Sequence, residues 1–198
     1  MSELLNQAKA LAPEIVRWRR HIHENPEVSA VLPNTCAYVT AELRKMGYEP
    51  YEVGGGVVAM LDGQPDGKVI LLRADMDALP FLIDGKKKNI HACGHDAHSA
   101  MLLAAASELV GKVKRGTLRI LFQQGEETLK GALAVIDAGV IEDVDIALGL
   151  HIRPVQDIAY GEMSPAVRHA SSTFVNVVIN GLSNHGARPH LGVSAIEA

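Results

Sequence analysis

Four groups of ionisable or metal-binding side chains stand out in this sequence, each beside a segment whose pattern predicts a strand or a helix. Three of the groups follow apolar runs: Asp75 and Asp77 come after 69–72, Glu126 and Glu127 after 118–122, and His151 after 146–150. The fourth group, His91-Ala-Cys-Gly-His-Asp-Ala-His98, precedes a predicted helix. Histidine nitrogen, cysteine thiolate and carboxylate oxygen all bind zinc and similar divalent ions. Together the four groups predict a metal site.

Cys93 and His95 are the pair most typical of a metal site. They flank Gly94, which permits unusual backbone angles, so both side chains can reach one ion. Each residue type alone also has a structural interpretation: a buried cysteine, a core histidine, a turn aspartate, or carboxylates near a helix N-terminus. Asp96 can instead be a helix cap, and His98 an early residue of the helix that follows. The joint placement, not any single residue, favours metal binding.

The chemistry predicted for such a site is hydrolysis. A bound metal lowers the pKa of its water toward ~7, and two metals ~3.5–4 Å apart can hold a shared hydroxide. A nearby carboxylate must then take the proton and pass it to the leaving nitrogen. Adjacent Glu126 and Glu127 can divide these tasks, one facing the water and the other the metal. Asp77 can orient a ligand from behind.

The elements that must position these residues alternate along the chain. Helical periodicity covers 3–23 and 35–46, and strand patterns cover 48–53, 57–61 and 68–72. Helices and strands then alternate over the ranges 97–110, 118–122, 131–138 and 146–150. This order predicts an α/β fold with a mixed, partly parallel sheet sandwiched by helices, whose ligands bind at the carboxyl ends of strands.

Beyond Pro165 the pattern changes, with a strand predicted over 172–180 and a helix beginning near Val193. We therefore predict two domains. Residues 1–168 form a catalytic domain, and residues 169–198 form the beginning of a smaller α+β domain.

Composition restricts the class of protein. The chain has 198 residues, 47% of them hydrophobic, and a net charge of −4. It is therefore typical of a globular protein and not of a nucleic-acid binder, and the Lys86-Lys87-Lys88 run is expected to be a solvated loop. No run approaches the ~18 apolar residues of a membrane span, and the N-terminus lacks signal-peptide features. With only Cys36 and Cys93 there is no disulfide framework, so we expect a cytoplasmic protein.

The motifs resemble those of the M20 metallopeptidases, in particular the amidohydrolases that act on N-acyl amino acids such as hippurate, N-acetyl-diaminopimelate and auxin conjugates. The resemblance rests on Arg73–Pro80, His91–His98, the Glu126-Glu127 pair, Gly149-Leu-His151 and His185–His190, together with Arg19–Glu27. It extends over almost the whole chain.

The resemblance implies a zinc-exopeptidase-like catalytic domain that hydrolyses the amide bond of N-acyl amino acids. Two divalent metal ions, zinc foremost with manganese, cobalt or nickel as alternatives, are expected on Cys93, His95, Glu127 and His151. Glu126 falls on the general base and Asp77 on the supporting carboxylate. His185 falls on a histidine of a lid or dimerisation domain that reaches the active site of the partner subunit in a homodimer.

Near its end, this sequence departs from the pattern of the family. Members of the family continue through the small domain and supply a last histidine ligand, which has no counterpart before Ala198. The chain is therefore expected to be a C-terminally truncated portion of such an enzyme. The alternatives are an inactive metal-binding or association fragment, and a related dipeptidase or aminopeptidase.

Overall fold

The structure is a computed structural model in which residues 2–165 and 173–197 are described. The contacts divide the chain into two units, Met1–Pro154 and Val155–Ala198. The predicted domain boundary between residues 168 and 169 lies outside the described residues, so it remains a prediction.

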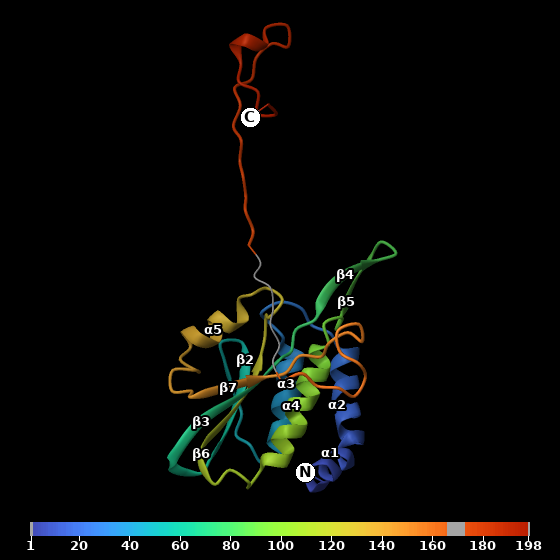
Figure 1. Ribbon diagram of the computed structural model, residues 1–198, viewed down its shortest axis with the longest axis vertical. Helices are drawn as coiled ribbons and strands as arrows, with labels where there is room; N and C mark the ends of the chain where they lie inside the picture. Colours follow the sequence, from blue (N-terminus) through green and yellow to red (C-terminus); the bar gives the residue numbers. More distant parts are fainter. Residues whose placement is uncertain (1, 166–172, 198) are drawn as a thin grey trace. The chain divides into compact units, whose positions relative to one another are not determined.

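The first unit is built around a five-stranded sheet of order β1-β2-β6-β3-β7 (Figure 1). Its strands are β1 (Tyr51–Val53), β2 (Gly56–Asp62), β3 (Gln64–Asp75), β6 (Arg115–Gln123) and β7 (Ile146–Gly149). β6 runs parallel to β3 and β3 parallel to β7, whereas β2 pairs with β1 and β6 antiparallel. The prediction of a mixed, partly parallel sheet is confirmed. The carboxyl ends of β3, β6 and β7 therefore meet at one end of the sheet.

Helices cover both faces of this sheet (Figure 1). The helices are α1 (Ser2–Ala10), α2 (Ala12–Glu24), α3 (Pro33–Lys45), α4 (His95–Leu109) and α5 (Gly131–Asp137). The larger core joins α2, α3 and α4 to the sheet and includes Trp18, Leu43, Leu103 and Phe122. The smaller core, on the other face, includes Val58, Leu121 and Val135 of α5. Burial of these side chains fixes α4 against the strands whose ends carry the candidate site.

The predicted helix over 3–23 is divided in two, because α1 ends at Ala10 and α2 begins at Ala12. Pro13 lies in the first turn of α2, where its missing N–H leaves no hydrogen bond unmade. α2 is joined to α3 by Glu42, a buried carboxylate. It accepts hydrogen bonds from Trp18 Nε1 at 2.6 Å, Arg17 Nη2 at 2.7 Å and Lys45 Nζ at 2.6 Å.

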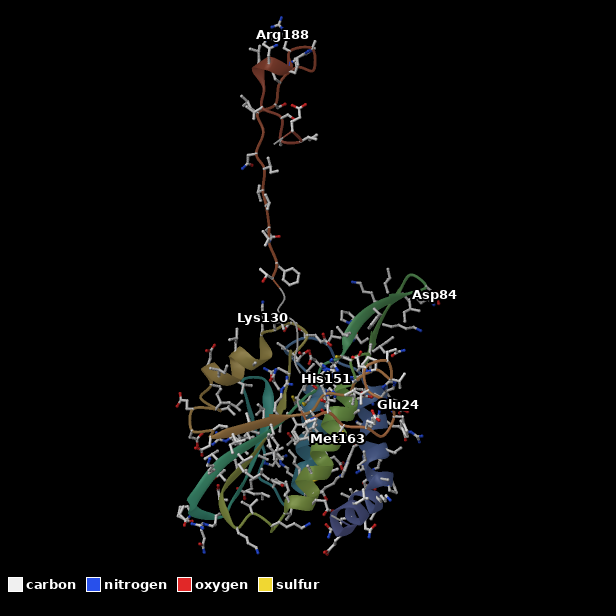
Figure 2. The ribbon with its side chains drawn as sticks, viewed as in Figure 1. Glu24, Asp84, Lys130, His151, Met163 and Arg188 are labelled. Atoms are coloured by element: carbon white, nitrogen blue, oxygen red, sulfur yellow. The ribbon has the colours of Figure 1, made fainter. Side chains whose placement is uncertain are left out.

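The prediction of a loop at Lys86-Lys87-Lys88 was wrong. These residues belong to β5 (Lys86–Ile90), which pairs antiparallel with β4 (Leu79–Ile83). Asp84 and Gly85, with φ of 51° and 73°, form the two-residue turn at the tip of this hairpin, where Figure 2 labels Asp84. The three lysines are exposed.

The second unit differs from the prediction over its described residues. Residues 173–180 form no strand, and Phe174 and Val175 are largely exposed, since no strand among the described residues pairs with them. Val193 begins no helix, because its backbone N–H and C=O pair with those of Leu182. A short 3₁₀ helix, η1, covers Pro189–Leu191.

Among residues 2–165 and 173–197, the helices are all too short or too polar to cross a membrane.

Candidate active site

Two aspartates at the end of β3 support the candidate site. Asp75 and Asp77 are two residues apart and both are 1% exposed. Asp77 Oδ1 lies 3.4 Å from His95 Nδ1, and Asp77 Oδ2 accepts the backbone N–H of Glu127 at 3.0 Å. Asp77 therefore contacts two of the predicted metal ligands, the arrangement expected of a carboxylate that orients ligands from behind.

His95 occupies the centre of the site. It is the first residue of α4 and is completely buried. Its Nε2 lies 3.8 Å from Glu126 Oε2, from Glu127 Oε1 and from Asp75 Oδ2. Burial lowers the pKa of His95, but the carboxylates of Asp77, Asp75 and Glu126 outweigh burial and raise the pKa. The ring therefore lies in a strongly negative, enclosed environment suited to a cation.

Gly94 makes the turn that leads into His95. Its φ is +86°, a left-handed conformation that costs a side-chain-bearing residue energy. A Cβ at this position would also lie 2.0 Å from Cδ1 of Ile152. The backbone angle thus favours glycine, and a side chain at this position would also have to displace the Ile152 side chain.

Glu126 and Glu127 follow β6 and differ in exposure. The side chain of Glu126 is 36% exposed and that of Glu127 is 23% exposed. Burial and the neighbouring Glu126 carboxylate raise the pKa of Glu127. Glu127 Oε1 is buried without a hydrogen-bond partner in the described part of the chain. Glu127 therefore offers a buried oxygen without a hydrogen-bond partner among the described residues, whereas Glu126 is more open to solvent.

Cys93 and His151 approach each other from different parts of the chain. Cys93 Sγ lies 3.4 Å from His151 Nε2, and His151 lies near the N-terminal end of α4 (Figure 2). Burial, together with Glu127 and Glu126, raises the pKa of the Cys93 thiol to about 12. A metal ion must therefore displace a proton from this thiol in order to bind the thiolate.

The donor atoms fit a metal centre. Cys93, His95 and His151 form one group whose ligand atoms lie within 4.8 Å of one another, and His95, Glu126 and Glu127 form a second. Both ring nitrogens of His95 are buried without a hydrogen-bond partner among the described residues. Buried polar atoms of this kind are normally paired, and a bound cation would satisfy one of the two nitrogens while the other carries the hydrogen. The structure thus brings together six predicted site residues: Asp77, Cys93, His95, Glu126, Glu127 and His151.

A third group, Asp75, His95 and His98, also meets this distance criterion. Sequence reasoning assigned no role to Asp75. The Asp-x-Asp spacing could have pointed to Asp75, since residues two apart on a strand share a face. His98 lies one helical turn after His95, which places both on the same face of α4.

Asp96 is not a helix cap, since no side-chain cap bond forms at the start of α4. It is completely buried and contacts His23 Nδ1 at 2.8 Å and Arg19 Nε at 3.2 Å. Asp96 therefore links α4 to α2.

His185 belongs to the second unit and is exposed. Its Nδ1 accepts a hydrogen bond from the backbone N–H of Ala187 at 3.2 Å. Its predicted role across a dimer stays a prediction.

Comparison with known proteins adds an independent line of support. Residues 71–189 match the family described as Peptidase family M20/M25/M40. An N-acyl-L-amino acid amidohydrolase from Geobacillus stearothermophilus is 37% identical, covering 92% of this chain and 53% of the relative. Thermostable carboxypeptidase 2 from Saccharolobus solfataricus is also 37% identical, covering 99% of this chain and 53% of the relative.

Among solved structures, the Bacillus subtilis YXEP protein is described as a dinuclear metal binding peptidase from the M20 family. It is 35% identical and superposes with a TM-score of 0.68, covering 74% of this chain and 44% of that one. The chain spans about half the length of the curated relatives it matches.

Proposed function

Because this chain belongs to the M20/M25/M40 peptidase family, we propose that it carries the metal-binding part of an amidohydrolase that cleaves the amide bond of N-acyl amino acids. The observation that supports this function best is the convergence of Cys93, His95, Glu127 and His151, with Glu126 beside them. The name of the Geobacillus relative favours the same substrate class. A non-catalytic metal-binding module is not favoured.

Cys93, His95, Glu127 and His151 would hold two divalent metal ions, for which zinc is our first choice. When bound, such ions supply a water of lowered pKa and polarise the amide carbonyl. Asp77 keeps His95 and the Glu127 main chain in position through the contacts described above. The donor set includes one thiolate, which suits zinc or cobalt better than magnesium or calcium.

Glu126 would act as the general base. Its side chain is the more exposed of the glutamate pair, and its Oε2 lies 3.8 Å from the central histidine. From this position the carboxylate can take a proton from water and return it to the amine nitrogen as the amide C–N bond breaks. His185 of a partner subunit would stabilise the developing oxyanion, which makes a homodimer the expected assembly.

The test is a substrate panel of N-acetyl and N-benzoyl amino acids, assayed for release of the free amino acid with Zn²⁺, Mn²⁺, Co²⁺ or Ni²⁺ added. Glu126→Gln should abolish turnover and keep wild-type metal content, because the amide retains the shape but not the basicity. Glu127→Gln is the matched variant and should lower metal content. Wild-type turnover in Glu126→Gln would remove this residue as the base.

A peptidase is the second candidate, because the Saccharolobus relative is named a carboxypeptidase. Free dipeptides in the same panel separate the two functions, since N-acylated amino acids lack a free amine. Faster release from free dipeptides would favour the peptidase.

The cytoplasm remains our proposed compartment. Both Cys36 and Cys93 are free thiols in the structure. A reducing compartment would keep Cys93 available to the metal.

A further inference from the structure

Asp75 lies beside the proposed metal ligands, yet protein groups already occupy its carboxylate. Asp75 Oδ1 lies 2.6 Å from His98 Nδ1, and Asp75 Oδ2 accepts a hydrogen bond from Arg73 Nη1 at 2.9 Å. Its backbone carbonyl accepts the hydroxyl of Ser99 at 2.8 Å. Because both carboxylate oxygens have partners, Asp75 is a poor candidate for a metal ligand.

His98 has the same property, since both of its ring nitrogens are used. Nδ1 faces the Asp75 carboxylate, which only accepts hydrogen bonds when ionised. Nε2 accepts the backbone N–H of Ile152 at 2.9 Å. Both contacts are satisfied together only by the neutral ring with its hydrogen on Nδ1. No lone pair of His98 remains for a metal ion.

The backbone of Ile152 connects His98 to His151 through two successive peptide groups. Its N–H donates to His98, while its carbonyl oxygen lies 2.5 Å from His151 Nδ1. A carbonyl only accepts, so Nδ1 of His151 must carry the hydrogen. The lone pair of His151 is then on Nε2, the nitrogen that lies 3.4 Å from Cys93 Sγ.

Side-chain packing restrains the same segment. The Ile152 side chain packs on Gly94, and the rings of His98 and His151 meet edge to face with their centroids 4.6 Å apart. The segment after β7 is thus attached to the start of α4 by a hydrogen bond and by two packing contacts. Its position depends on His98, whose ring is held in turn by Asp75.

We infer that Asp75 and His98 are positioning residues that set the place and the tautomer of the metal ligand His151 through the backbone of Ile152. The inference rests on the proposed function, which makes His151 a ligand. On this inference the two aspartates have different roles: Asp77 orients His95 and Glu127, and Asp75 orients His151. Groups that hold a metal-binding histidine by its second nitrogen typically change metal affinity by 10–100-fold when removed.

The test is a Co²⁺ titration of the whole 198-residue chain, followed by the thiolate-to-cobalt absorption that reports Cys93 as a ligand. Asp75→Asn places an amide beside His98, which can donate to Nδ1 and so favour the wrong tautomer. We expect its Co²⁺ affinity to fall about 10–100-fold. Asp96→Asn is the matched control, because it also alters a buried carboxylate that contacts a histidine, but its partner His23 lies on α2.

A second pair of variants separates the two nitrogens of His98. The Gln side chain in His98→Gln can still accept the Ile152 N–H, whereas the shorter Asn side chain in His98→Asn reaches only toward Asp75. We expect the Gln variant to bind Co²⁺ within a few-fold of wild type and the Asn variant to lose affinity. The chemical shifts of the imidazole nitrogens should show the hydrogen of His151 on Nδ1 in wild type and in the Gln variant, and a different distribution in the Asn variant.

The decisive comparison is a double-mutant cycle with His151→Ala. If Asp75 acts through His151, then Asp75→Asn should weaken Co²⁺ binding in wild type and cause no further loss in His151→Ala. Additive losses, or equal losses in Asp96→Asn, would overturn the inference and leave the proposed function standing. Absence of the cobalt–thiolate absorption in wild type would refute the metal site itself.

Discussion

Replacing Gly94 by alanine tests the geometry on which the candidate site depends. The left-handed φ of +86° costs a residue with a Cβ about 1–2 kcal/mol. The new Cβ would also lie 2.0 Å from Ile152 Cδ1, so the isoleucine must leave its rotamer at a cost of about 0.5–1.5 kcal/mol. We therefore expect Gly94→Ala to lower the free energy of unfolding by about 1.5–3.5 kcal/mol.

Gly111→Ala provides the matched control. Gly111 also has a left-handed φ, +70°, but no atom lies within 4 Å of the position that an alanine methyl group would take there. The control should therefore show only the backbone cost of about 1–2 kcal/mol. The difference between the two variants measures the contact with Ile152.

Urea unfolding followed by circular dichroism is the assay, with the slope against urea checked to be the same in each protein. Ile152→Ala should remove most of the excess cost when combined with Gly94→Ala. Metal content of Gly94→Ala should fall as well, because the displaced isoleucine moves the segment that carries His151. Equal destabilisation by Gly94→Ala and Gly111→Ala would refute the reasoning.

Three further predictions concern other residues. Burial raises the pKa of Glu42, but its three hydrogen-bond donors outweigh burial and lower it from 4.5 to about 2. The stabilisation is thus complete above pH 4.5 and lost as the pH falls toward 2. Two of the donors are partly exposed, which weakens their effect, so we expect Glu42→Gln to lower the free energy of unfolding by about 2 kcal/mol at neutral pH. In the variant, this free energy should depend less on pH between 4.5 and 2. Tyr48→Phe removes a buried hydrogen bond of 2.8 Å to the carbonyl of Ala106 and should cost about 1–2 kcal/mol in urea unfolding. Cys93→Ser should lower bound zinc, measured by plasma mass spectrometry after dialysis, with unchanged far-ultraviolet circular dichroism; full zinc content would exclude the thiolate as a ligand.

Much of the fold around the candidate site could be predicted from the sequence because its signals are local. Apolar runs such as 118–122 identify strands buried on both faces, and the polar residues that follow them mark the carboxyl end of the sheet. Cys93 and His95 are close in the chain, so their joint placement needed no knowledge of the fold. The family resemblance supplied the role predicted for each glutamate.

Other features could not be predicted because they depend on contacts between distant segments. The pairing of His98 with Asp75 requires α4 to lie along β3, and its bond to Ile152 requires β7 to pair with β3. The β4–β5 hairpin was missed for a different reason. Its Asp-Gly turn was a readable signal, but the run of three lysines suggested a loop, although charged residues are common on exposed strands.

The order of the strands has a consequence for how the protein folds. β7 pairs with β3 across a long stretch of sequence, with Ile146 opposite Ile70, and among the strands of this sheet in residues 2–165 and 173–197 it comes last in chain order. Such non-local pairing is slow, because the entropy of closing a long loop is lost before the contacts form. His151, which follows β7, therefore joins Cys93 and His95 only after β7 has paired with β3. A metal ion that requires all three should bind after β7 has paired with β3, so raising its concentration should slow unfolding and leave the folding rate unchanged.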